Sequence, residues 1–467
     1  MRAFPASLQA SRRRALALLT LASLAASPGA RADQSGAIAP PPRMVEAPAV
    51  ERLSLEQALA LAEERNLQLA LSGEQVDTAR SALTEARAAL GPSVSLSASQ
   101  SNQTVNLVAQ GFPKPGAGPT LFPALDGPFN SFDARLVFSQ SIFDARRSHL
   151  AHASERQLAE AEHQRAALEE QIAAAVELAY ITVQEQVAGL EAAEGNLTLS
   201  RELLTLAQDQ RSAGVATGVD VARAETRVAQ DQYALSQARS GRDQGLLRLK
   251  RLLGLPAAMP IELATVLAYQ ERTPPTAAEA VGRAESERQE LRVLDERIAA
   301  AEESVGAADA QRLPVVTVQA GIGPSGSTPV QTVYLTRSIG IGVSVPLFTG
   351  GAVDAQRDRA RSELRSAQLQ REDARRQIEE DVHLALLALS TSADQVAAAR
   401  TSLSLGERLL ELSRDRFAQG VADNLEVLDA LNATTTARSR LIEAIAAHSA
   451  ARANLDAALG TARSFKL

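Results

Sequence analysis

The two halves of this chain carry the same landmarks in the same order, and this duplication restricts its possible folds more than any other feature. The segment from Ser54 to Leu69 aligns with the segment from Thr276 to Leu291 at an offset of 222 residues. Farther along, Gly214-Val215-Ala216 recurs as Gly420-Val421-Ala422 at an offset of 206. A chance match between unrelated helices would not keep glycine, proline and phenylalanine landmarks in order, so we expect two copies of one plan.

These landmarks divide the 467 residues into six expected segments. They are a signal peptide over 1–32, an irregular N-terminal linker over 33–52, a first structural repeat over 53–253, a linker between repeats over 254–275, a second structural repeat over 276–461 and a C-terminal tail over 462–467. The signal peptide is expected from an arginine cluster, a short apolar run and a small-x-small cleavage site. No later run of about 18 consecutive apolar residues follows, so the sequence predicts no transmembrane helix.

Each repeat is expected to run helix, two strands, long helix, turn and returning helix. The first helix is predicted from Ser54 to Leu90, where Gly91-Pro92 ends it. Alternation of apolar and polar residues predicts strands at about 93–107 and 131–142 in the first repeat, and at about 315–323 and 333–347 in the second. A glycine- and proline-rich stretch near 111–130 is expected to be a loop and accounts for the greater length of the first half.

The longest predicted helices cannot bury themselves within one chain. Residues 144–213 contain no proline, and at about 1.5 Å per residue they predict a rod of about 100 Å. Residues 353–419 predict a counterpart, and each rod ends at a glycine turn, GVATGVD or GVADNLE, from which a shorter helix returns. Helices of this length must pack side by side in a bundle, a coiled coil or a wall.

The predicted strands have the length and alternation of membrane β-barrel strands, although a soluble hairpin on a core gives a similar pattern. Four strands cannot close a barrel, and an open edge in lipid would leave backbone groups unsatisfied at a cost of several kcal/mol each. If the strands span a membrane, chains must share one barrel, and three chains would supply twelve strands. The expected fold class is therefore mainly α with a membrane β-barrel portion, a trimeric 12-stranded β-barrel continuous with a 12-helix α-barrel tunnel.

Composition and missing motifs argue against several functions. There is no cysteine, which removes disulfides and thiol nucleophiles. The formal charge is −7, and no basic patch appears, so nucleic acid is not an expected partner. The GxGxxG match at 321–326 precedes a strand and fails the dinucleotide test. His149 and His152 are three residues apart, but two histidines on a polar helix are usually surface residues. We expect no enzyme activity, no cofactor and no metal.

Several motifs, in order and largely twice over, resemble the TolC-like outer-membrane efflux protein family. They include LSLEQALALAEERNLQL, the strand exits FSQSIFDARR and VSVPLFTGG, AYITV followed by RSAGVATGVDVARAE, RLLGLP, and RFAQGVADNLEVLDALNATTTARSRL. The resemblance covers about residues 53–461. It implies a homotrimer whose barrel lies among outer-membrane lipid and whose helical tunnel extends into the periplasm. Such a subunit provides the passive exit duct of a tripartite efflux pump or type I secretion system, together with a periplasmic adaptor protein and an inner-membrane transporter.

The resemblance also assigns roles at the helix–helix turns. Glu426 and Asp429, with Asp220 at the matching position of the first repeat, would form an acidic ring at the periplasmic aperture. Ordinary first-turn carboxylates, which the helix dipole favours, are the competing interpretation. The tip turns that would meet the adaptor are Gly214, Val215, Ala216, Gly420, Val421 and Ala422. Phe417 and Ala422 depart from the family's polar Tyr and Arg gate.

The main alternative is a periplasmic adaptor (membrane fusion) protein of such a pump. An adaptor is also exported and rich in coiled coil, but it would carry one helical hairpin flanked by glycine-rich β-domains. The duplicated strand pairs favour a channel. A purely structural coiled coil and an exported hydrolase are weaker alternatives, because the first lacks a reason for the alternating strands and the second lacks a catalytic constellation.

Overall fold

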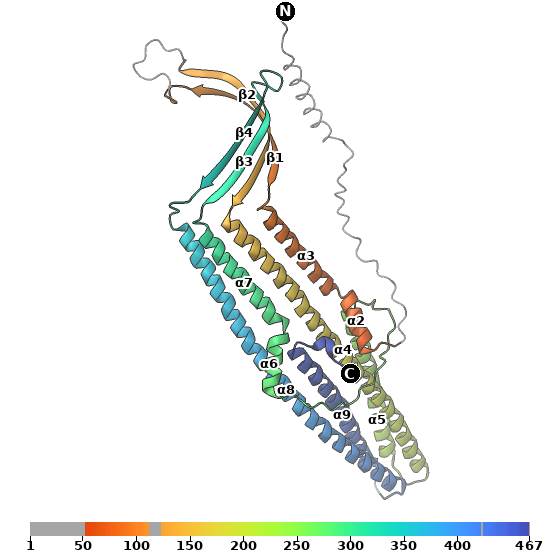
Figure 1. Ribbon diagram of the computed structural model, residues 1–467. Helices are drawn as coiled ribbons and strands as arrows, with labels where there is room; N and C mark the ends of the chain where they lie inside the picture. Colours follow the sequence, from red (N-terminus) through yellow and green to blue (C-terminus); the bar gives the residue numbers. More distant parts are fainter. Residues whose placement is uncertain (1–51, 112–122, 422–423, 467) are drawn as a thin grey trace, which may run out of the picture. The chain divides into compact units, whose positions relative to one another are not determined.

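A computed structural model of the protein describes residues 52–111, 123–421 and 424–466 (Figure 1). The expected signal peptide and almost all of the N-terminal linker lie outside these residues. In chain order the elements are α2 (Leu55–Arg65), α3 (Leu67–Ala88), β1 (Ser93–Asn106), β2 (Leu125–Phe143), α4 (Ala145–Ser212), α5 (Gly218–Leu252), α6 (Ala277–Glu287), α7 (Gln289–Ala310), β3 (Val315–Gly326), β4 (Tyr334–Ser344), α8 (Ala352–Ala418), α9 (Asn424–Ala458) and the short 3₁₀ helix η1 (Ala462–Ser464).

Corresponding elements of the two halves keep nearly constant spacings. Helices α2 and α3 recur as α6 and α7, 222 residues later, and α5 recurs as α9, 206 residues later. The prediction of one helix from Ser54 to Leu90 is wrong, because an extended residue, Asn66, separates α2 from α3. Asn66 accepts from the Gln68 amide through its side chain and donates to the Leu252 carbonyl at 2.9 Å, so a distant contact holds the break.

The strands form one antiparallel sheet in the order β1-β2-β3-β4. Pairing of β1 with β2 runs from Ser93 opposite Ser139 out to Asn106 opposite Leu125. Residues 125–130, expected in a loop, therefore belong to β2, and this part of the loop prediction is wrong. Glycine and proline in this stretch hide the alternation, while backbone pairing to β1 keeps the residues extended.

The register of the sheet separates apolar from small polar residues. In one cross-strand row Val94 pairs with Phe138, Phe138 with Ala320 and Ala320 with Ile339. The apolar side chains on this face include Val94, Leu96, Leu136, Ile322, Ile339, Ile341 and Val343, all substantially exposed. The opposite face carries mostly serine, threonine and glycine, because side chains alternate between faces along each strand.

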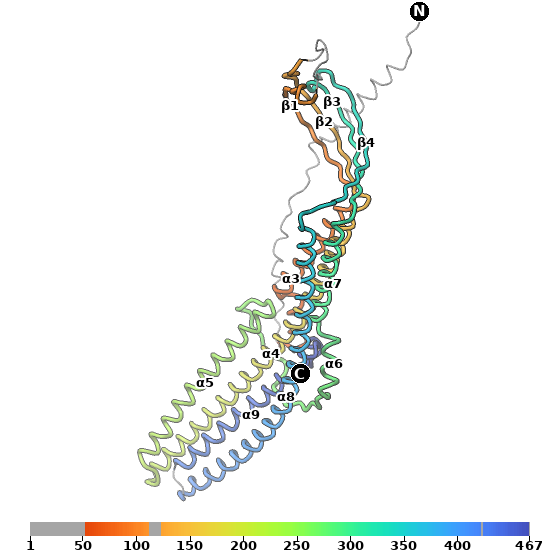
Figure 2. Tube along the Cα trace, turned by 90° about the vertical axis from the view of Figure 1, so that its left-hand side faces the viewer, coloured from red at the N-terminus to blue at the C-terminus, as the bar shows by residue number. Residues whose placement is uncertain are grey.

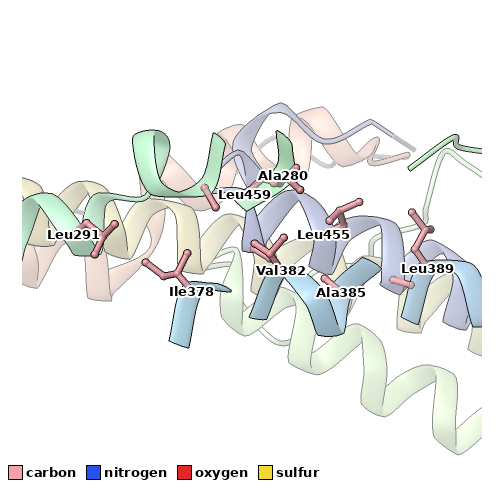
Figure 3. Packing of buried hydrophobic residues seen from close by; sticks show 11 residues of the cluster. Ala280, Leu291, Ile378, Val382, Ala385, Leu389, Leu455 and Leu459 are labelled. Atoms are coloured by element: carbon pink, nitrogen blue, oxygen red, sulfur yellow. The ribbon is translucent and has the colours of Figure 1, made fainter. Parts of the chain in front are cut away.

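The long helices lie side by side in the order α5, α4, α9, α8 (Figure 2). One core cluster joins α6, α7, α8 and α9, and Figure 3 shows its side chains converging between them. Its members are Ala280, Ala284, Leu291, Ile378, Val382, Ala385, Leu389, Ala451, Leu455, Ala458 and Leu459. Alanine and other small residues let the helices approach closely, and truncating a buried leucine here would cost about 2–5 kcal/mol.

The linker and the tail fold onto these helices. Leu53 forms a parallel bridge with Leu263, and the Tyr180 hydroxyl of α4 donates to the Leu53 carbonyl at 2.9 Å. Farther along the linker, Arg272 binds both carboxylate oxygens of Asp456 at 2.7 Å. The tail continues through η1 and buries the Phe465 ring. The linker between the repeats and the C-terminal tail therefore both pack against the long helices.

One helix of the described residues, α8, contains a stretch apolar enough to cross a membrane by length and composition, with a mean hydropathy of 1.2. The sequence predicted no transmembrane helix because no run of about 18 consecutive apolar residues follows the signal peptide. Helices packed in a protein core can be equally apolar, and Ile378, Val382 and Leu389 of α8 lie in the core cluster. These contacts make α8 a packed helix of the wall.

Candidate functional site: the helical tip

Two glycine turns join the long helices at one end of the wall. Gly214 has φ 79°, and the amides of Gly214 and Val215 bond back to the last turn of α4, Val215 reaching the Gln210 carbonyl at 2.9 Å. Gly420, with φ 69°, and Val421 repeat this pattern at the end of α8. This is the Schellman arrangement, in which glycine takes a left-handed conformation that costs other residues energy. The predicted turn residues thus occupy equivalent positions in the two repeats, while Ala422 lies outside the described residues.

Three contacts bring the two turns together. A Cβ atom at Gly420 would lie 3.6 Å from the Val215 side chain, so these turns are in van der Waals contact. The Gln210 amide donates to the Phe417 carbonyl at 2.8 Å. On the returning helices, the Asn424 amide donates to the Asp220 carbonyl at 2.9 Å, and Asn424 is fully buried. The first hairpin, α4 and α5, is therefore bonded to the second, α8 and α9, at the tip.

Phe417 lies in the core of the tip. Its side chain is 3% exposed and packs in a cluster with Leu203, Leu410, Val427, Ala430 and Leu431. The sequence marked Phe417 as a position that cannot make the family's polar gate contacts. The structure gives its side chain an apolar role between α4, α8 and α9.

Asp220 acts as a cap in this structure. Its Oδ2 accepts from the Thr217 amide at 2.8 Å and from the Thr217 hydroxyl at 2.7 Å, and its own amide completes a capping box at the start of α5. The Thr217 hydroxyl, followed by the Thr217 amide, holds the pKa of Asp220 below its ordinary value. The carboxylate is therefore ionised at neutral pH and stabilises α5.

Glu426 and Asp429 occupy the first two turns of α9, three residues apart. Glu426 lies 3.6 Å from the Arg416 guanidinium, an ion pair in which both side chains are partly exposed. Asp429 is exposed to solvent. The three carboxylates thus differ locally: a cap, an ion pair and an exposed side chain. All are charged groups near the paired turns.

A polar contact between α5 and α9 was not predicted from the sequence. The Arg227 guanidinium bonds to Asp231 on its own helix at 2.9 Å, to Asn432 and to the Thr435 hydroxyl at 3.3 Å. The side chains of Arg227 and Asp231 are about one-tenth exposed. An Arg-x-x-x-Asp spacing signals the pair on α5, but nothing in the sequence indicates its partners about 205 residues away.

Nothing among the described residues forms a metal-binding group of three or more ligating side chains. His149 Nδ1 lies 2.7 Å from Glu303 Oε2, whereas His152 Nδ1 is 3.9 Å from the same atom. The histidines that stood out in the sequence therefore contact a carboxylate of α7.

The family model described as outer membrane efflux protein matches residues 58–255 and 280–461. Among curated proteins, nodulation protein T of Rhizobium leguminosarum bv. trifolii is 25% identical over 60% of this chain and 61% of its own length. The alkaline protease secretion protein AprF of Pseudomonas aeruginosa is 28% identical over 56% of this chain and 55% of its own length. The alignments thus span less than two thirds of these relatives.

Solved structures share the fold. The outer-membrane channel OprN superposes with a TM-score of 0.76 at 20% identity, covering 87% of this chain and 90% of that one. The outer membrane protein VceC from Vibrio cholerae gives a TM-score of 0.74 at 20% identity, over 87% and 96% of the two chains. The matched family consists of outer-membrane channel proteins, which are not enzymes. Because the residues that match the family model make up well over half of this chain, the chain belongs to the outer membrane efflux protein family.

Proposed function

We propose that this protein is the subunit of a trimeric outer-membrane channel that provides the exit duct of a tripartite efflux pump or a type I secretion system. The duct is passive, and an inner-membrane transporter supplies the energy. Its β-barrel lies in the outer membrane, and its helical tunnel extends into the periplasm. Family membership supports the outer-membrane location and a channel in place of the adaptor alternative.

One observation carries this proposal: the sheet has two open edges and an exposed apolar face. β1 and β4 are its outermost strands. Ile339 of β4 is 83% exposed and Leu96 of β1 is 74% exposed. An open edge in lipid is costly, so further copies must pair with β1 and β4. Three copies give twelve strands, an even number within the range of bacterial barrels.

The helical wall supports the same assembly. Its outer helices, α5 and α8, expose apolar side chains that have no function in an isolated chain. They include Tyr233 and Leu247 on α5, and Leu369, Leu384, Leu387, Leu405, Leu409 and Leu412 on α8. In a closed tube, α5 of one copy packs against α8 of the next, and three copies contribute twelve helices.

The tip is the proposed periplasmic mouth. Three copies would place Glu426, Asp429 and Asp220 around one axis, where carboxylates raise the local concentration of cations. Asp429 is the strongest member because it is exposed, whereas Asp220 also caps α5. The turns at Gly214 and Gly420 would meet the periplasmic adaptor, with Val215 and Val421 as exposed apolar contacts.

The names of the relatives point to two classes of cargo. One relative is named for alkaline protease secretion and another for toluene efflux. The first implies polypeptide export and the second implies removal of small apolar molecules.

Reconstitution of the purified protein in planar bilayers tests the proposal. We expect an oligomer of three times the monomer mass and long-lived conductance steps. Glu426→Gln combined with Asp429→Asn should lower cation selectivity, while Glu407→Gln, a carboxylate higher on α8, should not. A folded protein that stays monomeric in detergent and never inserts would exclude the channel. Steps with unchanged selectivity would retain the channel and exclude the acidic ring.

A further inference from the structure

The polar face of the sheet carries very little charge. Where all four strands pair, cross-strand rows on this face contain mostly serine, threonine and glycine, as in Ser95–Val137–Gly321–Ser338 and Ser93–Ser139–Gln319–Gly340. Asp133 and Arg135 of β2 are the charged residues on this face within that part of the described sheet. Arg337, the third charged residue there, pairs with Ile322 and so lies on the apolar face.

Asp133 and Arg135 bind each other on that face. The Arg135 Nε donates to Asp133 Oδ1 at 2.5 Å, and Nη2 donates to Oδ2, so the pair is bidentate. The side chains are 32% and 33% exposed, which leaves both within reach of solvent. A two-pronged guanidinium–carboxylate contact has a fixed geometry, unlike most exposed ion pairs.

Glycines of β3 make room for the arginine. A Cβ atom on Gly323 would lie 2.0 Å from the Ala134 carbonyl oxygen and 2.4 Å from the Arg135 Cα, so no side chain fits there. A Cβ atom on Gly321 would lie 3.7 Å from the Arg135 Cδ. The arginine stem therefore extends over a strip of β3 without side chains, and Ser97 pairs with Arg135 on its other flank.

We propose that the Asp133–Arg135 pair keeps the barrel lumen free of net charge, so that the lumen does not select between anions and cations. The inference rests on the proposed trimer, in which the apolar face meets lipid and the polar face lines the lumen. Three pairs then form a ring of six charges with no net charge, within a wall of small neutral side chains. Such a lumen passes anions and cations alike, so selection by charge is confined to the helical mouth, and the duct suits cargo of either sign.

The proposal predicts opposite effects for replacing Arg135 and for replacing Asp133. Removing Arg135 leaves three uncompensated carboxylates around the lumen, which attract cations. Removing Asp133 leaves three guanidinium groups, which attract anions. Removing both restores neutrality. At about 0.1 M salt the screening length is about 10 Å, so such a ring acts well into the lumen.

Reversal potentials across a KCl gradient near 0.1 M, measured on single channels, test this inference. We expect Arg135→Gln to raise the cation-to-anion permeability ratio several-fold and Asp133→Asn to lower it several-fold. The double variant should return to the wild-type ratio, and Arg135→Lys should stay close to it. The matched control, Arg337→Gln, removes the same charge from the opposite face and should change nothing.

The outcomes separate this inference from the proposed function. Conducting channels whose selectivity is the same in both single variants, or moves in one direction in both, overturn the charge-ring inference and leave the channel intact. An Arg337→Gln shift equal to that of Arg135→Gln also overturns it, because the lumen would then be on the other face. A well-folded wild-type protein that never conducts counts against the channel itself. Circular dichroism of each variant confirms that the sheet has formed.

Discussion

At the residue scale, Glu177 of α4 is an unusual buried acid. Its side chain is 0% exposed, and neither carboxylate oxygen has a hydrogen-bond partner among the described residues. Burial first, and then the negative charges of Asp456 and Glu170, raise the pKa of Glu177 to about 9. The group is therefore a neutral acid at pH 7, held between helices where an ionised carboxylate would be costly.

We expect Glu177→Gln to be relatively more stable than the wild type at high pH. In the unfolded chain a glutamate loses its proton near pH 4.3, whereas folded Glu177 keeps it until about pH 9. The folded state therefore binds more protons between these values, and wild-type stability falls as pH rises through this window. Thermal unfolding followed by circular dichroism at pH 5 and pH 8.5 would measure the difference, which should exceed about 1 kcal/mol. Parallel pH profiles for both proteins would contradict the assignment.

His448 of α9 should show the opposite pH dependence. Its Nε2 lies 3.1 Å from the Gln270 carbonyl oxygen, which only accepts, so Nε2 carries a proton, and its Nδ1 lies 3.0 Å from the Ser392 hydroxyl oxygen. Burial first lowers the pKa of His448, and the charge of Arg452 lowers it further. Because the unfolded state then binds more protons, stability should decline as pH falls below about 6.5. Replacement by asparagine should flatten this acidic decline, and an unchanged slope would count against a buried neutral imidazole. The same unfolding assay between pH 5 and 7 measures it.

At the element scale, the C-terminal tail connects helices of the two repeats. Phe465 is 3% exposed, and the Arg452 guanidinium lies 5.4 Å from its ring centre. The Arg452 guanidinium also donates to the Lys466 carbonyl at 3.0 Å. Arg463 forms ion pairs with Glu63 at 2.7 Å and Glu169 at 3.2 Å. The tail thus links α9, in the second repeat, to α2 and α4, in the first.

Phe465→Ala should destabilise the helical wall far more than Arg463→Gln. Truncating a buried phenylalanine costs about 3–5 kcal/mol, because it removes apolar contact and leaves a cavity. Exposed ion pairs contribute about 0–1 kcal/mol each, so Arg463→Gln is the matched control. Chemical unfolding monitored at the helical circular dichroism band compares them. Equal losses of stability in the two variants would show that the Arg463 ion pairs contribute as much as the Phe465 ring to holding the tail on the helices.

The regular elements could be predicted from the sequence because their causes are local. Long proline-free stretches with apolar residues at helical spacing predicted α4 and α8 to within a residue or two. Asn66 escaped prediction because its break depends on a bond to Leu252, which is 186 residues away. At the tip, the Thr217–Asp220 capping box was not predicted although its Thr-x-x-Asp spacing is local, and the bond from Gln210 to Phe417 has no local signal at all. Contacts between the two repeats join residues that are far apart in the sequence, so they can be recognised only once the fold is known.

At the scale of the whole molecule, the two faces of the sheet are expected to tolerate different substitutions. In an isolated chain, β4 is exposed on both faces, so neither face would resist a charged substitution strongly. In the proposed barrel, Ile339 faces hydrocarbon whereas its neighbour Ser338 faces a watery lumen. Two adjacent positions therefore distinguish a membrane barrel from a soluble sheet.

We expect Ile339→Lys to block stable membrane insertion and Ser338→Lys to allow it. A lysine facing lipid near the middle of the bilayer costs about 2–4 kcal/mol per copy, and a trimer meets this cost three times. A lysine in the lumen keeps its hydration, because the polar face surrounds it with serine and glycine. Fractionation of cells expressing each variant, with the amount of heat-resistant oligomer in the outer-membrane fraction as the readout, compares them. Equal membrane yields for both variants would mean that the apolar face does not contact lipid, and the twelve-stranded barrel would have to be abandoned. A deficit confined to Ile339→Lys would instead tie the alternation first seen in the sequence directly to the orientation of the sheet in the membrane.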